Sequence, residues 1–242
     1  MRRVCDDAYK AEHELGGEPM KLKLIAAATL GAGLLSAAEA PERLEAAADA
    51  LKEVMGIPDK SIPQDLLSRA QCIVIVPGLK KGAFIIGAKY GKGFVSCRRP
   101  GGVGWSAPGS IRVEGGSFGF QIGGTDTDAF MLVMNEKGMD RLLSTKFTLG
   151  GDASVAAGPV GRSTQAETDA ALTAEILTWS RQRGLFAGVS LSGATLREDE
   201  DWNKDLYGKK ITNRDIIMKG GVAAPKAAAA LMTELNRYSS RK

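Results

Sequence analysis

Apolar residues recur at helical spacing in the region that follows residue 40. The segment "PERLEAAADALKEVMG" (residues 41–56) places them on one stripe, with Pro41 at its beginning and Gly56 at its end, which predicts a helix. The segment "IPQDLLSRA" (62–70) predicts a second, shorter helix. The apolar run "QCIVIVP" (71–77) predicts a buried strand that stops at Pro77, because proline cannot donate to a strand ladder.

Between Gly82 and Gln121 the pattern changes to short apolar stretches bounded by glycine or proline. They predict a series of strands: "GAFIIGAKYG", "GFVSCRR", "GWSAP", "SIRVEGG" and "SFGFQIGG". The segment "DAFMLVMN" predicts another strand and "EKGMDRLLS" a short helix, and no fixed-period repeat or linker divides the chain. We therefore expect an α+β fold, a single domain with a mainly antiparallel, glycine-rich curved sheet or partial barrel flanked by helices.

The stretch "TWSRQRGLFAGVSLSG" (178–193) is predicted to join a helix to a strand. Thr164 and Glu167 have the spacing of a capping box, which predicts a helix that ends with Arg181 and Arg183 in its last turn and Gly184 after it. Cations there complement the helix dipole. In the strand that follows, the first face holds Leu185, Ala187, Val189 and Leu191, and the second holds Phe186, Gly188, Ser190 and Ser192. We expect Gly188 to be a point of close backbone approach.

Composition supports a folded globular chain and weakens the case for a nucleic-acid partner. The 242 residues are 44% hydrophobic and 25% charged, and the formal net charge is +4. That charge is too small to indicate nucleic-acid binding, and no basic run is interleaved with aromatic residues. The 30 glycines, spread along the chain, indicate turns and close backbone approach and not a flexible linker.

The N-terminal region predicts export. Lys21 and Lys23 precede an apolar run and then small residues, as in a signal peptide over residues 20–38 that is cleaved near Ala38. The run is too short for a membrane span, and the alternative is an amphipathic or buried helix. Residues 1–19 are then an upstream misreading of the start, without ordered structure, and the mature protein is periplasmic or secreted.

Two cysteines remain after such a cleavage, and the only histidine, His13, is removed with the leader. In an oxidising compartment Cys72 and Cys97 could form a disulfide, and two buried free thiols are equally compatible with their apolar surroundings. The sequence leaves both states open.

The motifs that resemble catalytic or metal sites lack essential parts. Ser117 centres a G-x-S-x-G pattern, but a strand is predicted after it and no histidine base remains. The stretch "DEDWNKD" (199–205) resembles a calcium loop, but Lys204 stands where the loop needs glycine and Lys210 where it needs glutamate. A solvated acidic helix start is the preferred interpretation, and we expect no catalytic residue, no metal and no cofactor.

Several segments together resemble the SYLF domain family. They are "IPQDLLSRAQCIVIVPGLKKGAFIIGAKYGKGFVSCR", "GWSAP", "GSFGFQIGG", "FTLGGDASVAAGPVGR", "SRQRGLFAGVSLSGATL" and "LYGKKITNRDI". The resemblance covers residues 62–217 and implies a lipid-binding domain without enzymatic activity over 62–242, preceded by an N-terminal helix within 39–61. Eukaryotic relatives bind phosphoinositides and act on actin, whereas bacterial relatives are usually exported. We therefore expect a lipid or membrane partner in the cell envelope and no actin binding.

Cations beside glycine turns are the candidate phosphate contacts, because they combine charge with exposed backbone N–H groups. These candidates are Lys80, Lys81, Arg98, Arg99 and Arg162. The alternative for each is a solvated turn. The alternative function is a periplasmic structural or protein-partner-binding module that uses an exposed "GWSAPGS" segment and the C-terminal helix "PKAAAALMTELNRY".

Overall fold

The computed structural model describes residues 39–58, 61–83, 86–99, 101, 103–118, 123–161, 173–182, 185–189 and 191–239. All the helices and strands described below lie in one compact unit, Glu39–Lys242. Several predicted features lie outside the described residues: the segment 1–19, the leader 20–38, the Thr164–Glu167 capping box, Arg162, Arg183, Gly184 and Ser190.

The helices predicted over 41–56, 62–70 and 136–144 are confirmed. They form a helix over residues 39–55, α2 (Gln64–Arg69) and α3 (Glu136–Leu142). The Asn135 side chain begins α3 by accepting a 2.7 Å hydrogen bond from the backbone N–H of Gly138. In the part of the chain that the structure describes, the other helical elements are α5 (Glu200–Tyr207), α6 (Asn213–Met218), η2 (Lys226–Ala228) and α7 (Ala229–Ser239). No helix in the described ranges is long and apolar enough to cross a membrane.

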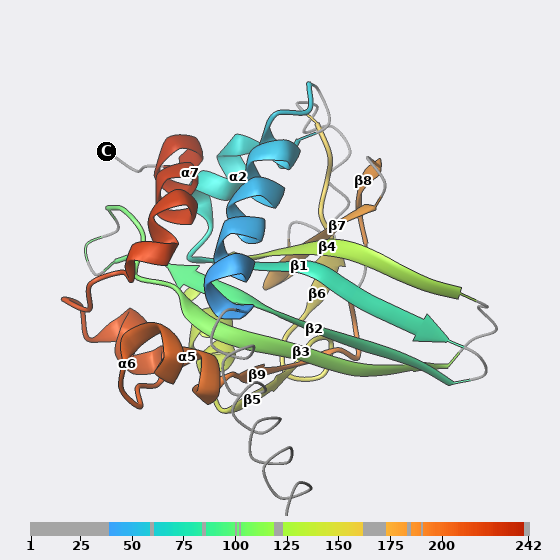
Figure 1. Cartoon of the computed structure of the whole chain (residues 1–242). Coiled ribbons are helices and arrows are strands. Elements are labelled where there is room, and N and C mark those ends of the chain that lie inside the picture. Colours follow the sequence, from blue (N-terminus) through green and yellow to red (C-terminus); the bar gives the residue numbers. More distant parts are fainter. Residues whose placement is uncertain are drawn as a thin grey trace, which may run out of the picture. The chain divides into compact units, whose positions relative to one another are not determined.

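The predicted curved, mainly antiparallel sheet is also confirmed. Within the described residues it has nine strands: β1 (Cys72–Ala83), β2 (Ile86–Cys97), β3 (Gly109–Phe118), β4 (Gly123–Val133), β5 (Lys146–Thr148), β6 (Val155–Ala157), β7 (Ile176–Gln182), β8 (Leu185–Gly188) and β9 (Thr195–Glu198). Their order is β5-β9-β3-β2-β1-β4-β7-β6, and β8 also pairs with β7. The β6–β7 pair is parallel, and the other pairs are antiparallel. The sheet curls into an open half-barrel (Figure 1).

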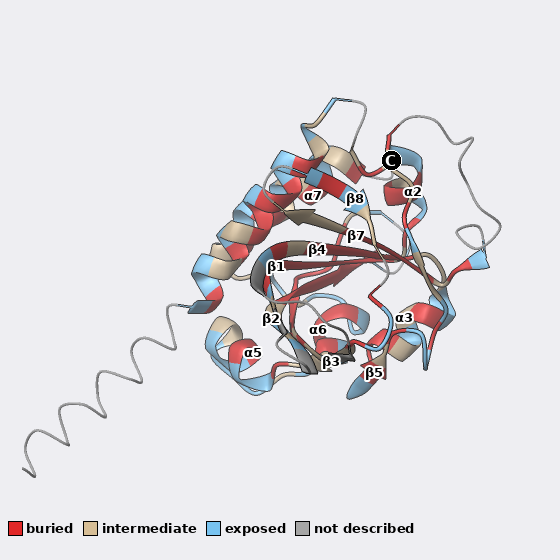
Figure 2. Ribbon diagram, turned by 90° about the vertical axis from the view of Figure 1, so that its right-hand side faces the viewer, coloured by how far each residue is buried: buried red, intermediate tan, exposed pale blue. Residues whose placement is uncertain are grey.

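Alternate residues of the central strands supply two hydrophobic cores, one on each face of the sheet. On the outer face Ile73, Ile75 and Phe94 pack against the helix over 39–55, α2 and α7. On the inner face, Val74 and Val95 pack with residues of α3, α6, β5 and β9. Figure 2 shows the strands buried between these helices, whose pale, exposed sides face outward. Coverage on both faces explains why the strands are nearly continuous apolar runs where the helices lie.

The strands are longer than predicted, because glycine and proline interrupt the pattern without ending the strands. Pro77 does not stop β1; it lies at a β-bulge between Val76 and Leu79, where the pairing with β4 shifts. Gly93 lies inside β2, and a Cβ there would lie 2.1 Å from the carbonyl oxygen of Ile75. Pro77 and Gly93 thus lie within strands, and the prediction that proline and glycine mark strand boundaries here was wrong.

The prediction that Arg181 ends a helix was wrong. Residues 176–182 form strand β7, in which Trp179 pairs with Phe130 of β4 and is fully buried. Ile176, Thr178 and Trp179 favour a strand, and pairing with a buried neighbour decides between the two patterns. Arg181 therefore lies in a strand beside Asp128 and not at a helix C-terminus.

The strand predicted after this segment is present as β8 but shorter, and its packed face is the one that holds Phe186 and Gly188. Phe186 contacts the outer core, whereas Leu185 is 77% exposed. The close approach predicted at Gly188 is confirmed, because a Cβ there would lie 2.0 Å from the carbonyl oxygen of Gly158. The stretch is therefore a tightly packed β-hairpin joint.

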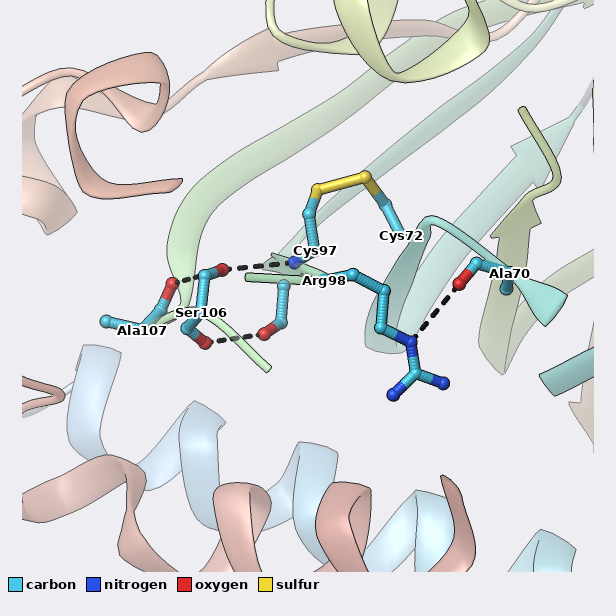
Figure 3. The surroundings of a disulfide bond; sticks show 7 residues. Ala70, Cys72, Cys97, Arg98, Ser106 and Ala107 are labelled. Atoms are coloured by element: carbon cyan, nitrogen blue, oxygen red, sulfur yellow. Dashed lines mark hydrogen bonds between the residues drawn. A yellow bond between two sulfur atoms is a disulfide. The ribbon is translucent and has the colours of Figure 1, made fainter. Parts of the chain in front are cut away.

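Cys72 and Cys97 form a disulfide between β1 and β2, which decides the question left open by the sequence. The two residues are register partners in the antiparallel pair, and both are fully buried. Figure 3 shows the bond beside the chain that continues from Cys97 to Arg98, with Ser106 on the adjacent segment. The Ser106 hydroxyl accepts a 3.1 Å hydrogen bond from the backbone N–H of Cys97.

Candidate functional site

The bulge at Pro77 decides which way the two lysines of β1 face. Beyond it, Leu79 returns to the inner core, so Lys80 falls on the outer face and Lys81 on the inner face. Two contacts hold the bulge. Arg43 donates to the carbonyl of Pro77 at 3.0 Å, and the backbone N–H of Gly78 donates to Asp128 at 2.9 Å. The bulge is therefore stabilised by specific hydrogen bonds, and it sets the face of the sheet on which each lysine lies.

Lys81 and Lys89 are the central residues of the candidate site. They are direct register partners in the β1–β2 pair, on the inner face of the sheet. Directly opposite residues on one face bring their Cβ atoms to about 4.5–5.5 Å, and like charges in this position repel. Burial, followed by the charge of Lys89, lowers the pKa of Lys81. Among the described residues, no carboxylate forms an ion pair with either lysine.

A buried hydroxyl lies next to this pair. Thr127 of β4 is 3% exposed and pairs with Leu79, so it lies on the inner face one pleat away from Lys81. Its Oγ1 has no hydrogen-bond partner among the residues that the structure describes. Buried hydroxyls are normally satisfied, so this covered oxygen is an unmet hydrogen-bonding group beside the lysine pair. The two ammonium groups, which no carboxylate of the described residues neutralises, can together bind an anion.

The pair lies where the sheet extends past its helices. Lys81 is near the end of β1 and Lys89 near the beginning of β2, and in Figure 1 these ends of β1 to β4 project beyond the helical layer. Lys80 is on the outer face of the same region, opposite Tyr90 and Asp126. Tyr90 is 48% exposed. The projecting end is therefore accessible to a large partner such as a membrane surface.

Arg98 does not belong to a binding site, which corrects the prediction from sequence. It is 6% exposed, and its Nε donates to the carbonyl of Ala70 at 3.3 Å (Figure 3). Its terminal nitrogens donate to Leu67 and to Ser239, and its guanidinium lies 3.8 Å from the Trp105 ring. These contacts satisfy carbonyls at the ends of α2 and α7, so Arg98 stabilises the fold.

The other predicted cations lie apart from the Lys81–Lys89 pair. Arg99 follows the far end of β2, is exposed, and lines a separate cavity. Arg162 lies outside the described residues. Of the five predicted cations, the structure thus brings Lys80 and Lys81 to one end of the sheet and adds Lys89 and Thr127, which the sequence analysis missed. The register of the β1–β2 hairpin was the signal needed to find Lys89.

Arg181, from the stretch predicted to end a helix, forms an ion network. Its Nε donates to Asp128 Oδ2 at 2.9 Å, and its Nη1 contacts the Glu53 carboxylate. Glu53 lies on the helix over residues 39–55, so the network connects this helix to β4 and β7. Arg181 is paired with two carboxylates, which makes it a structural residue.

The calcium-loop-like stretch (199–205) and the G-x-S-x-G pattern at Ser117 both lie within secondary structure elements or at their ends. Asp199 is 2% exposed, caps α5 by accepting from Trp202 N–H at 3.1 Å, and pairs with Lys92 at 3.0 Å. The helix start is confirmed there, but Asp199 is not solvated. Ser117 lies within β3, and the next element is β4, not a helix. Across the described ranges, no three His, Cys, Asp or Glu side chains form a group that could hold a metal.

The surface proposed from sequence for a protein partner is largely buried. In "GWSAPGS", Trp105 is 1% exposed and its Nε1 donates to Leu235 of α7 at 3.2 Å. Leu231 and Leu235, the apolar side of α7, belong to the outer core. The predicted exposure of this segment was wrong, because the C-terminal helix covers it.

Known proteins are similar to this chain over the segments that the sequence analysis compared with a family. The family described as "Ysc84: Las17-binding protein actin regulator" matches residues 114–238, just over half of the chain. The SH3 domain-containing YSC84-like protein 1 of Xenopus laevis is 34% identical over 201 residues, which cover 81% of this chain and 59% of that protein. The Homo sapiens protein of that name is 34% identical over 185 residues, 76% of this chain and 53% of its own length.

The yeast relative is similar over a comparable region. Protein YSC84 of Saccharomyces cerevisiae is 36% identical over 178 residues, which cover 72% of this chain and 37% of the yeast protein. The chain thus spans less than two thirds of the length of these curated relatives. The family match and the shared segments confirm the resemblance seen in the sequence, and the chain belongs to the Ysc84 family, the family of the SYLF domain.

Proposed function

We propose that the chain is a non-enzymatic lipid-binding domain protein that holds anionic phospholipid head groups between Lys81 and Lys89. The observation that carries the proposal is the direct cross-strand pairing of these two lysines without a carboxylate among the described residues. A phosphate between them would remove their mutual repulsion and accept hydrogen bonds from both. The Thr127 hydroxyl, buried and without a partner among the described residues, lies on the same face.

The location of the pair supports a membrane as the source of the anion. The projecting end of β1–β4 carries a third cation, Lys80, on its other face. Cations near an anionic membrane contribute about 1 kcal/mol each, and this contribution falls as salt increases. We further propose that the protein acts in the cell envelope, after export and cleavage near Ala38.

Vesicle flotation tests this function. The purified protein is mixed with vesicles of phosphatidylcholine, of phosphatidylcholine with phosphatidylglycerol, or of phosphatidylcholine with phosphatidylinositol 4-phosphate. We expect flotation with the two anionic compositions, weakened by salt, and its loss in the double variant Lys81→Gln/Lys89→Gln. Lys52→Gln, which removes an exposed lysine from the helix over 39–55, is the matched control. Failure to float with either anionic vesicle, or undiminished flotation of the double variant, contradicts the proposal.

A second candidate function is binding of an actin-regulating protein partner. It is favoured by the family description, which names Las17 binding and actin regulation. Cosedimentation of the purified chain with filamentous actin, at salt concentrations that abolish flotation, separates the two functions. Cosedimentation that survives in Lys81→Gln/Lys89→Gln would favour the second candidate, and would contradict our expectation that an exported protein does not bind actin.

A further inference from the structure

A second candidate binding site lies at the opposite end of β2 from the Lys81–Lys89 pair. It is a cavity of about 450 Å³ between the segment that joins β2 to β3 and the segment that follows α6. Arg99 lies ten positions after Lys89, which at about 3.3 Å per residue places the two sites roughly 30 Å apart. The volume is within the range of sites that enclose small ligands.

Arg99 is held in a fixed orientation at this cavity. Its Nε donates to the carbonyl of Trp105 at 2.9 Å, and its backbone N–H donates to Gly104 at 3.3 Å. The two terminal guanidinium nitrogens make no ion pair or hydrogen bond with the described residues. Their shared edge is therefore free to donate two parallel hydrogen bonds, the geometry that matches a carboxylate.

The charge of the cavity suits an anion with a single charge. Among the described residues that line it, Arg99 alone is charged. Lys219, which precedes the lining glycines, is paired with Asp215 at 2.9 Å. A carboxylate would be neutralised by Arg99, whereas a phosphate monoester would retain excess negative charge.

Apart from Arg99 and Ser106, whose hydroxyl is hydrogen-bonded to the backbone of Cys97 and Ala107, the side chains that line the cavity are apolar or absent. Its walls include Ala107, Ile216, Ile217, Val222 and Ala223. Two of the four large apolar side chains that are exposed on the described residues belong to the segments that form it. These are Val103, 60% exposed, and Met218, 39% exposed. One cation beside a mainly apolar wall is the pattern of a site for an amphiphile.

The wall formed after α6 depends on two glycines. Gly220 and Gly221 have φ angles of 65° and 74°, a region that other residues rarely adopt. A Cβ on either would meet nothing within 4 Å, so the turn and not packing requires glycine. The turn leaves open space beside the cavity.

We propose that this cavity binds a single-chain fatty acid, with its carboxylate on the terminal nitrogens of Arg99 and its hydrocarbon chain against Val222 and Ala223, over the buried Ile216 and Ile217. The site is separate from the phospholipid site, and its ligand carries one negative charge and one chain. It would allow the protein to hold a free fatty acid while the Lys81–Lys89 end contacts a membrane.

Titration calorimetry with decanoate tests the proposal. We expect the wild-type chain to bind decanoate and to bind 1-decanol at least about tenfold more weakly, because a charge-assisted pair is lost. Arg99→Gln should lower decanoate affinity by about tenfold or more, and Arg99→Lys should fall between, because lysine keeps the charge but not the two-point geometry. Lys52→Gln, which is not at the cavity, should be unchanged.

A second variant keeps the test independent of any folding defect in Arg99→Gln. Val222→Asp leaves Arg99 in place but puts a carboxylate in the apolar wall, and it should also abolish decanoate binding. Circular dichroism establishes that each variant is folded. Absence of decanoate binding to the folded wild type, equal binding by Arg99→Gln, or equal binding of 1-decanol would each overturn the proposal. None of these results bears on phospholipid flotation.

Discussion

Gly188 of β8 lies directly against the backbone of Gly158, so that a Cβ on Gly188 would be 2.0 Å from the Gly158 carbonyl oxygen. A single carbonyl group of β7, that of Thr178, holds both segments. It accepts a 2.9 Å hydrogen bond from the N–H of Gly158 and a 3.1 Å hydrogen bond from the N–H of Val189. Two segments distant in sequence therefore meet along one edge of β7. The contact has room for hydrogen only.

Replacing Gly188 should destabilise the fold. Gly188→Ala must displace a backbone carbonyl, which cannot rotate away as a side chain can, and overpacking of this kind costs roughly 1–3 kcal/mol. Gly188→Val should cost more. The free energy of unfolding in urea measures both. Gly151→Ala is the matched control, because a Cβ there would make only ordinary contacts, at 3.6 Å from Thr148. Equal stability of Gly188→Ala and the control would contradict the close contact.

Arg181→Gln should lower the free energy of unfolding by more than the loss of a cation at a helix C-terminus would. The change removes the charge partner of Asp128, whose side chain is only 17% exposed. Leaving a largely buried carboxylate without its partner costs roughly 1–3 kcal/mol. Glu53→Gln should have little effect, because Glu53 is 59% exposed. Urea unfolding of both variants tests this contrast, and a small effect in both would show that the network contributes little.

Lys81→Gln should increase stability while it weakens lipid binding. It removes a like-charge pair, a gain of roughly 0.2–1 kcal/mol. Because the pKa of Lys81 is lowered in the folded chain, the unfolded chain holds this proton to higher pH. Wild-type stability therefore rises with pH between the folded pKa and the ordinary 10.5, and the advantage of the variant shrinks over the same interval.

Urea unfolding near pH 7 and at about pH 10 measures this dependence. Lys52→Gln controls for the loss of a surface lysine. A variant less stable than wild type near pH 7 would mean that Lys81 makes a favourable contact in the unliganded protein, and the argument for an anion between the lysines would fail.

Removal of the disulfide should lower stability by roughly 2–4 kcal/mol, because Cys72 and Cys97, 25 residues apart, restrict the unfolded chain. The double variant Cys72→Ala/Cys97→Ala measures this in urea. Alkylation of the denatured, unreduced wild-type protein, followed by mass spectrometry, should find neither cysteine modified. Modification of both would show that the thiols are free.

The sequence by itself determined the elements whose patterns are strong and local. The helix over 39–55, α2, α3 and the apolar strands were predictable because periodicity and capping residues are properties of neighbouring positions. The family was recognisable for the same reason, since its segments are contiguous. The close approach at Gly188 was also predictable, because glycine alternating with serine on a strand indicates a crossing neighbour.

Only the tertiary structure decided how these elements pair. Trp179 could belong to a helix or a strand until β4 was placed beside it, and Pro77 could end a strand until the bulge showed that pairing resumes at Leu79. Lys81 and Lys89 are eight residues apart in sequence and become neighbours through hairpin register, which a shift of one residue would reverse. Arg98 and Arg99 are adjacent in the chain, yet one satisfies buried carbonyls and the other lines a cavity. Which groups share a face depends on pairing between distant segments, and this long-range packing fixes the sites.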